Sequence, residues 1–406
     1  MLCSTTGLQE VSMNVLVVPM FALSRMGGPW SRAQAIAAAF DRAGHRVVLA
    51  MADDGNCVGP CVSDTCRLPV PAPLGLPMAV SSRTFPVAER LGIAGRKPVH
   101  SFEEVLWLTG ALDYAYELES VDAIRAAVEL HAIDVIYSEF SLPAIIAGRA
   151  LGLPVFGSFS FTTQASYASN PGKASGVRKL LRDIGLNDVE SSLDLFGWLD
   201  RRFVPSCREL EPIEDDGIEF VGFLRDLPEL GSERRSEQRD ERRSEQRDCV
   251  LVYLGAGSVP QRRVEKVVVS ALGSFGEAVY VAGSADERQE GDVYFAPRFD
   301  FSQLLPRARC FVHHGGQNST MDALAYGVPQ VIVPGRVFER RYNAESIERV
   351  GAGVKLEALE PDVLADACRR VVEDPEFRES SMSMRRLLAA GGGAARIVAV
   401  VESAVG

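Results

Sequence analysis

The stretch of sequence that decides the fold reads His313-His314-Gly315-Gly316-Gln317-Asn318-Ser319-Thr320-Met321-Asp322. It follows Cys310-Phe311-Val312, which has the apolar character of a buried strand, and precedes a helix expected to run to about Tyr326. The glycine pair permits a tight turn, and Asn318 or Ser319 is expected to cap the helix, with Asp322 completing a capping box. A strand, a glycine turn and a helix N-terminus together direct free N–H groups and the positive end of the helix dipole to one point. The stretch therefore predicts an anion site, most simply for a phosphate.

Length and composition set the class of protein. A chain of 406 residues is too long for one core and predicts two domains, and its 47% hydrophobic residues supply well-buried cores. Apolar strands alternate with helical segments, which indicates an α/β architecture. The net charge of −11 argues against nonspecific binding to nucleic acid. No apolar run of about 18 residues and no N-terminal signal pattern occur, so we expect a cytoplasmic protein without an integral membrane segment.

Three of the eight cysteines cluster, at Cys57, Cys61 and Cys66. A metal or redox site is one interpretation of this cluster. Its spacing matches no common zinc pattern, however, and no fourth ligand lies nearby in the sequence. Unpaired loop thiols in a reducing compartment are the favoured interpretation.

The first half of the chain opens with the pattern of a strand, a helix and a second strand. Met13–Met20 is predicted to be a buried strand, Ser31–Ala43 an amphipathic helix with Ser31 as its N-cap, and Val47–Ala50 the next strand. Residues 1–12 show no structural pattern and are interpreted as an extension. This order is typical of a βαβ unit, in which a helix joins two parallel strands.

Residues 233–248 hold two tandem copies of the sequence Glu-Arg-Arg-Ser-Glu-Gln-Arg-Asp. The repeat has no apolar stripe, and its arginines are balanced by acidic residues, so a solvated, partly helical linker is favoured over a basic tract for nucleic acid. The second half then begins with a predicted strand, Val250–Tyr253, a glycine-rich turn at 254–260 and a helix from Gln261 to about Leu272.

The opening stretch, together with Gly327-Val328-Pro329 and the apolar run after it, resembles the donor-binding signature of nucleotide-sugar glycosyltransferases of family 1. These enzymes have the GT-B fold, an α/β fold of two facing Rossmann-like domains with a cleft between them. The resemblance implies an N-terminal extension at 1–12, an acceptor-binding domain at 13–225, a charged linker at 226–248, a nucleotide-sugar-binding domain at 249–388 and a C-terminal helix at 389–406 that crosses back to the first domain.

The resemblance also implies which residues hold the donor. They are Ser258, Arg298, Phe301, His314, Gly315, Gly316, Asn318, Ser319, Thr320, Asp322, Glu339 and Arg340. His314 and the amides near Asn318 to Thr320 would hold the diphosphate, and Asp322 would bind the ribose hydroxyls. Ser258, in the glycine-rich turn, would face the donor from below.

Two positions on the donor side depart from the family pattern. Arg298 stands where many members have a tryptophan that packs on the base, although a guanidinium can stack there too, and Phe301 beside it is either a base contact or a wall residue. In the sugar pocket Glu339 keeps an acidic residue, whereas Arg340 replaces a glutamine. Because arginine suits a carboxylate, an anionic donor sugar is a hypothesis, with a salt bridge to Glu339 or Glu345 as the alternative role of Arg340.

The acceptor side departs from the family at the catalytic base. The histidine that takes the proton from the acceptor hydroxyl corresponds to Pro29 here, and proline cannot act as a base. Glu139 stands where the family has the carboxylate that orients this histidine, so it is either the base itself or the cap of a helix around Leu142–Ala150. His100, in a predicted loop, is the second candidate base, or else a solvated loop residue.

The resemblance therefore implies an inverting glycosyltransferase that moves a sugar from a nucleoside diphosphate donor, UDP or dTDP, to a hydroxyl of a small-molecule or lipid-like acceptor. No metal and no cofactor are expected beyond this co-substrate, because the helix dipole can take up the charge of the diphosphate. The alternatives are a nucleotide-sugar-binding protein or auxiliary partner without transfer activity, which the loss of the histidine would favour, and a nucleotide-sugar epimerase. The oligomeric state stays open.

Overall fold

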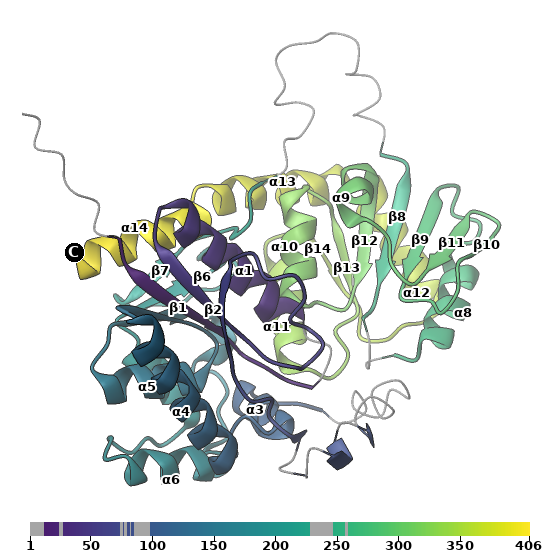
Figure 1. Ribbon diagram of the computed structural model, residues 1–406. Coiled ribbons are helices and arrows are strands. Elements are labelled where there is room, and N and C mark those ends of the chain that lie inside the picture. Colours follow the sequence, from purple (N-terminus) through teal and green to yellow (C-terminus); the bar gives the residue numbers. More distant parts are fainter. Residues whose placement is uncertain are drawn as a thin grey trace, which may run out of the picture.

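The structure, a computed structural model, describes residues 12–23, 27–73, 76, 79–81, 83–84, 98–227, 247–255 and 259–406. The described elements form two α/β domains, each built on a seven-stranded sheet with helices on its faces (Figure 1). The GT-B arrangement of two Rossmann-like domains that the sequence predicts is thereby confirmed.

The N-terminal domain has the strand order β3-β2-β1-β4-β5-β6-β7, and every pairing in it is parallel. Its interior strand β1 is buried from Val15 to Val18, because helices cover both faces of the sheet. The elements are β1 (Asn14–Pro19), α1 (Gly27–Arg42), β2 (Arg46–Met51), β3 (Asp64–Arg67), α3 (Phe102–Thr109), α4 (Tyr114–His131), β4 (Val135–Glu139), α5 (Leu142–Leu151), β5 (Val155–Ser158), η3 (Phe161–Thr163), η4 (Pro171–Lys173), α6 (Ser175–Asp183), η5 (Ser192–Trp198), β6 (Arg201–Val204) and β7 (Ile218–Phe220).

The C-terminal domain has the strand order β10-β11-β9-β8-β12-β13-β14, in which β10 alone is antiparallel to its neighbour. The described elements are β8 (Cys249–Tyr253), α8 (Gln261–Leu272), β9 (Ala278–Ala282), β10 (Arg288–Glu290), β11 (Val293–Ala296), α9 (Phe301–Leu304), η7 (Leu305–Arg307), β12 (Ala308–His313), α10 (Gln317–Ala325), β13 (Gln330–Ile332), α11 (Phe338–Arg349), β14 (Gly353–Lys355), α12 (Pro361–Glu373), α13 (Pro375–Ala389) and α14 (Gly393–Val405).

Each sheet changes the direction of its strand order at one place. In the N-terminal domain this place lies between β1 and β4, and in the C-terminal domain between β8 and β12. Open parallel sheets bind ligands outside the carboxyl ends of the strands at such a point. Glu139, at the end of β4, and His313, at the end of β12, both stand at these positions.

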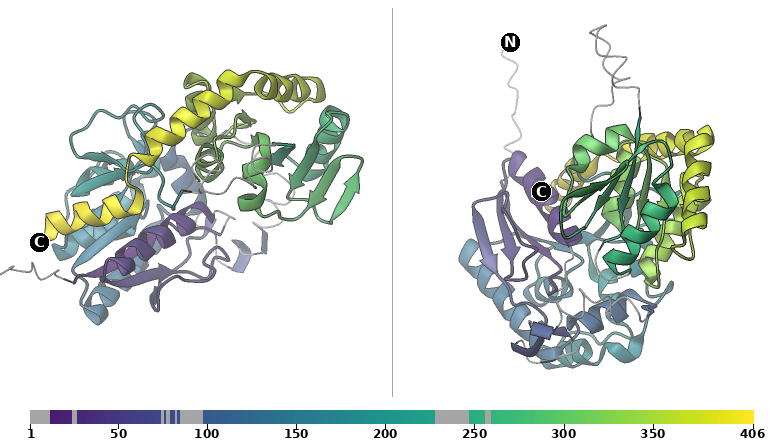
Figure 2. Two further views of the ribbon diagram at one scale, coloured as in Figure 1. Left: turned by 90° about the horizontal axis from the view of Figure 1, so that it is seen from above. Right: turned by 90° about the vertical axis from the view of Figure 1, so that its right-hand side faces the viewer.

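The last two helices run across both domains (Figure 2). α13 packs in the C-terminal domain through Met384 and Leu388, whereas Ile397 and Val401 of α14 are fully buried in the core of the N-terminal domain. Among the described residues, Pro375–Val405 is the one segment whose length and mean hydropathy of 1.4 would suit a membrane span. Glycines interrupt it at 391–393, and its burial against the first domain explains the apolar residues of α14.

The structure tests the predicted start of the first helix, but it does not describe most of the predicted extension and tandem repeat. The chain is already helical at Gly27, so Ser31 lies inside α1 and the prediction of Ser31 as the N-cap is wrong. Residues 1–11 and 228–246, which include most of the predicted extension and of the tandem repeat, lie outside the described residues.

Candidate active site

The turn after β12 is held by a buried histidine. His313 is fully buried; its Nδ1 accepts a hydrogen bond from the N–H of Gly315 at 3.1 Å, and its Nε2 lies 2.8 Å from Oε1 of Gln330. Burial lowers the pKa of His313 to about 4, so the ring is neutral. Because Nδ1 accepts, Nε2 carries the proton and donates to Gln330. His313 is therefore a structural residue, and its side chain fixes the start of the glycine turn.

Gly315 and Gly316 are required for different reasons. Gly315 has φ of +82°, and a Cβ there would lie 2.8 Å from the carbonyl oxygen of Arg340, so both backbone conformation and space demand glycine. The carbonyl of Gly315 also accepts from Nδ2 of Asn343 at 2.8 Å. At Gly316 a Cβ would lie 2.6 Å from Nε2 of His314, so glycine is needed there to make room for that imidazole.

Helix α10 begins without a side-chain cap. Its N-cap residue is Gly316, not Asn318 or Ser319 as predicted, and the first backbone hydrogen bond runs from Thr320 N to Gly316 O at 3.0 Å. The predicted capping box is therefore wrong. In the described part of the chain, the N–H groups of Gln317, Asn318 and Ser319 have no acceptor. Three uncapped donors at the positive end of a helix form an anion site.

His314 lies beside this helix end as a neutral ring. Burial, and next the positive charge of Arg340, lower the pKa of His314 to about 3. The ring meets Tyr253 edge to face with 5.6 Å between centroids, and Nδ1 is buried without a hydrogen-bond partner. Oγ1 of Thr320, in the first turn of α10, is likewise buried and unpartnered. Buried polar atoms normally have partners, so these two atoms are suited to receive a ligand.

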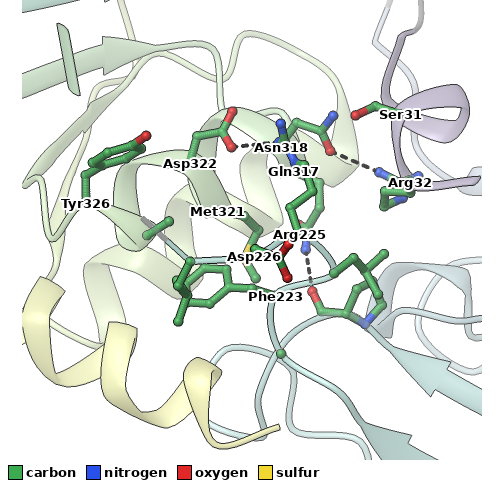
Figure 3. Close-up of a pocket in the computed structure, with 15 residues that line it drawn as sticks. Ser31, Arg32, Phe223, Arg225, Asp226, Gln317, Asn318, Met321, Asp322 and Tyr326 are labelled. Atoms are coloured by element: carbon green, nitrogen blue, oxygen red, sulfur yellow. Dashed lines mark hydrogen bonds and ion pairs between the residues drawn. The ribbon is translucent and has the colours of Figure 1, made fainter. Parts of the chain in front are cut away.

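A cavity of about 140 Å³ lies between the two domains against the first turns of α10 (Figure 3). Helix α1 contributes Ser31 and Arg32 to its wall, the chain after β7 contributes residues 222–227, and α10 contributes Gln317, Asn318, Met321, Asp322, Ala325 and Tyr326. Asp322 forms an ion pair of 2.7 Å with Arg225 in this wall. Burial raises the pKa of Asp322, while Arg225 acts in the opposite direction.

Glu139 is bound on both of its carboxylate oxygens. Oε1 accepts from Nε of Arg32 at 2.5 Å, and Oε2 accepts from the hydroxyl of Ser158, which also contacts the Tyr137 hydroxyl at 3.0 Å. The Glu139 side chain is 0% exposed. The prediction that Glu139 takes the acceptor proton directly is therefore not supported. The alternative that Glu139 caps the next helix is wrong, because Ser141 occupies the N-cap position of α5.

His100 lies in a segment that joins the domains. Val99 forms a parallel β-bridge with Val337, with hydrogen bonds of 3.0 Å from Val99 N to Arg336 O and from Phe338 N to Val99 O. The His100 side chain is exposed, and its backbone N–H donates to Glu104 at 2.8 Å. His100 therefore stands at the rim of the interface, close to the start of α11.

The predicted sugar residues lie on the first turn of α11. Burial raises the pKa of Glu339, and the charges of Arg32 and Arg340 oppose this rise. Glu339 is thus near cations of both domains. Glu345, one of the two predicted partners of Arg340, instead pairs with Lys355 at 3.0 Å.

Glu211 is a cleft residue that the sequence did not single out. It follows β6, is 5% exposed, and its Oε2 accepts from the N–H of Phe161 at 2.7 Å. Burial raises the pKa of Glu211 to about 7; Glu339 adds to the rise, and Arg32 opposes it. No sequence motif marks this position, because Glu211 reaches the cleft only through the folding of the loop after β6.

An aromatic cluster closes the interface beside Glu211. Phe161 of the N-terminal domain stacks on Tyr342 of α11, with 4.8 Å between centroids and 9° between planes, and Tyr167 meets both rings edge to face. The Tyr342 hydroxyl donates to the Leu210 carbonyl at 3.0 Å. Because Tyr342 lies on α11 two residues after Arg340, this cluster helps to fix the position of the predicted sugar residues relative to the N-terminal domain.

The predicted base contacts lie along the loop after β11. Arg298 is exposed, and Phe301 begins α9, where its ring meets Tyr253 and Phe311 edge to face at 5.9 Å and 5.5 Å. Phe301 is thus a wall residue next to the aromatic ring that supports His314. Ser258 lies outside the described residues.

The cysteines are reduced and form no metal centre in the described part of the chain. All seven described cysteines are free thiols, including Cys57, Cys61 and Cys66. Among the described residues no group of three or more His, Cys, Asp or Glu side chains is arranged to hold a metal ion. Burial raises the pKa of Cys57 to about 12 and that of Cys66 to about 11, so these two thiols are weakly reactive.

Comparison with known proteins points to one group of enzymes. Residues 282–403 match the C-terminal domain of the erythromycin biosynthesis protein CIII-like family. The chain is 27% identical over 313 residues to the NDP-glycosyltransferase YjiC of Bacillus subtilis (strain 168), covering 70% of this chain and 77% of that protein. It is 32% identical over 160 residues to the O-mycaminosyltylonolide 6-deoxyallosyltransferase of Streptomyces fradiae, covering 38% and 37% of the two chains.

Solved structures share the fold over nearly the whole length. A spinosyn rhamnosyltransferase complexed with thymidine diphosphate superposes with a TM-score of 0.69 at 17% identity, covering 96% of this chain and 100% of that one. The glycotransferase of kitacinnamycin gives a TM-score of 0.67 at 20% identity, with 97% and 99% covered. The chain is therefore a glycosyltransferase with the GT-B fold, and it is similar to natural-product enzymes of family 1 that use nucleoside diphosphate sugars.

Proposed function

We propose that this glycosyltransferase moves the sugar of a UDP or dTDP donor, with inversion at the anomeric carbon, to a hydroxyl of a small-molecule or lipid-like acceptor. The observation that supports this best is the first turn of α10, whose free N–H groups face the other domain across a cavity. Similar structures include a spinosyn rhamnosyltransferase solved with thymidine diphosphate and with the spinosyn aglycone, which favours a dTDP donor and a natural-product aglycone as the acceptor.

In this proposal the donor lies along α10 and α11. The amides of Gln317 to Ser319 and the side chains of Ser319, Thr320 and His314 hold the diphosphate. Asp322 binds the ribose once Arg225 releases it, and Arg298 and Phe301 border the base. Glu339 and Arg340 face the sugar. The helix end supplies positive charge to the diphosphate, so we expect activity without a metal ion.

The proton of the acceptor hydroxyl needs a base other than Glu139. Glu211 fits this role best, because its carboxyl is held by the N–H of Phe161, lies near Glu339 of the sugar pocket, and has a pKa that burial raises to about 7. His100, at the exposed rim, is the second candidate. In the reaction the acceptor oxygen bonds to the anomeric carbon, the bond to the diphosphate breaks, and the base takes the proton.

Transfer assays test the proposal. The purified chain is incubated with UDP- and dTDP-linked hexoses and deoxyhexoses and a panel of macrolide, polyphenol and lipid alcohols, with and without EDTA. We expect transfer that EDTA leaves unchanged, and a product whose anomeric proton coupling in NMR shows the configuration opposite to the donor. Retention of configuration would overturn the inverting mechanism. Tight donor binding with no product from any acceptor would favour a binding protein.

Location in the cell is a further part of the proposal. Free thiols at all seven described cysteines fit a reducing compartment, and we propose the cytoplasm. Fractionation of the source cells, with the chain recovered in the periplasm or outside the cell, would contradict it.

A further inference from the structure

Arg32 contacts both domains at their interface. It lies on α1, one turn after Pro29, and its side chain is 15% exposed. Nε donates to the fully buried Glu139 carboxylate, and Nη1 donates to Oδ1 of Asn318 at 3.3 Å. One guanidinium thus connects the end of β4 in one domain with the second residue of α10 in the other; Figure 3 shows its hydrogen bond with Asn318.

The N-terminal domain is built to hold this guanidinium in place. The carboxylate of Glu139 is itself fixed by the Ser158 hydroxyl, and the guanidinium lies 5.4 Å from the centroid of the Phe140 ring. Phe140 has φ of +59°, a left-handed conformation that is uncommon for a residue with a bulky side chain. The turn after β4 therefore adopts a strained conformation in which an aromatic ring lies close to the cation.

Close packing brings the first turn of α1 up to the donor helix. A Cβ on Gly28 would lie 3.4 Å from Nη1 of Arg32 and within 4.0 Å of the Asn318 side chain. Arg32 and Asn318 also line the same cavity, together with Gln317 and Asp322. The Arg32 guanidinium therefore lies next to the uncapped N–H groups of α10, and the side chain of Asn318 spans the distance between them.

We propose that Arg32 contacts the diphosphate of the donor and stabilises the negative charge that develops on it as the sugar leaves. This inference rests on the proposed donor site at α10. Glu139 is the positioning residue, since it orients the guanidinium and touches no substrate. Glu139 stands where the family has the carboxylate that orients the histidine, but here it orients Arg32, one turn after Pro29, and the pair supplies a positive charge in place of a base.

The competing explanation is that Arg32 only holds the two domains together. The two explanations differ in whether the positive charge of Arg32 is needed. In Arg32→Gln the cation is lost and a hydrogen-bonding amide remains. In Arg32→Gln combined with Glu139→Gln, the buried pair is neutral and no unpaired carboxylate is left to destabilise the fold. Arg42→Gln, on the exposed end of the same helix, is the matched control.

The experiment measures Kd for UDP and dTDP, Kd for uridine and thymidine, kcat for transfer, and the melting temperature of each variant. We expect both Arg32 variants to bind the nucleoside diphosphate about tenfold more weakly and the nucleoside within about twofold of the wild type. We expect kcat to fall by about a hundredfold or more, the range seen when one charge-stabilising donor is removed. The double variant should regain the wild-type melting temperature, whereas its diphosphate affinity and its kcat should stay low. Arg42→Gln should match the wild type in every measurement.

Two outcomes would overturn the inference: unchanged diphosphate affinity and kcat in both Arg32 variants, or equal loss of nucleoside and diphosphate affinity. Binding and transfer by the wild type distinguish failure of this inference from failure of the proposed function. If the wild type binds neither UDP nor dTDP, the donor site itself is wrong; if it binds and transfers, the variants decide the role of Arg32.

Discussion

At the scale of single residues, the two adjacent histidines differ in what their buried nitrogens contact. Both ring nitrogens of His313 have protein partners, whereas Nδ1 of His314 has none. The motif in the sequence shows both histidines but does not tell them apart, because the difference arises from Gln330, a residue on the neighbouring strand. The role of His314 in the donor site stays a prediction.

The raised pKa of Glu211 predicts that stability and catalytic rate depend on pH in opposite directions. Burial places its pKa at about 7, above the value near 4.5 of an exposed glutamate, so the folded state holds a proton that the unfolded state has lost. The free energy of unfolding therefore falls as the pH rises from about 4.5 through 7. Glutamine cannot ionise, so Glu211→Gln should avoid this fall and gain up to about 3 kcal/mol over the wild type at pH 8. As the base, Glu211 must be ionised, so wild-type kcat should fall below pH 7, and the variant should lose most of its activity.

The measurements are urea unfolding and kcat, each from pH 5 to 9. Glu209→Gln, in the same loop but exposed, is the matched control and should change neither profile. A Glu211→Gln variant with wild-type kcat and an unchanged acidic limb would contradict the catalytic role. Loss of the acidic limb of the kcat profile in His100→Gln would identify His100 as the base.

At the scale of elements, the C-terminal helix α14 belongs to the core of the other domain. Ile397 is fully buried there beside Val15, Trp30 and Ala33. Ile397→Ala should lower the free energy of unfolding by about 2 to 5 kcal/mol, because a large apolar side chain is removed from a packed core. Denaturant unfolding measures this change.

The matched control for α14 is Ser403→Ala, an exposed position on the same helix, which should stay within about 0.5 kcal/mol of the wild type. An Ile397→Ala variant within about 0.5 kcal/mol of the wild type would contradict the packing of α14 against the first domain.

Elements differ in how well the sequence predicts them. The strand, glycine turn and helix around His314 could be read from residue types, because apolar periodicity and glycine positions act locally. The start of α1 and the cap of α10 could not. Asp322 was expected to cap its own helix, but Arg225, distant in sequence, holds it instead. Likewise Glu139 looks available in the sequence until Arg32 of α1 is placed against it.

At the scale of the whole molecule, the domains meet through contacts that enclose the donor site. The Val99–Val337 bridge, the Phe161–Tyr342 stack, the Arg32–Asn318 hydrogen bond and that from Gln317 to the Pro205 carbonyl at 3.5 Å all join one domain to the other. The cavity of about 140 Å³ is smaller than the roughly 300 Å³ or more of typical ligand pockets. The residues that line this cavity do not include Glu339 and Arg340, the predicted sugar residues.

A crystal structure of the chain with UDP or dTDP would show where the phosphates bind. We predict the diphosphate oxygens at hydrogen-bond distance from the N–H groups of Gln317 to Ser319, with the Arg32 guanidinium turned from Asn318 towards them and still paired with Glu139. A diphosphate bound elsewhere in the chain, with the first turn of α10 empty, would contradict the donor site proposed for this glycosyltransferase.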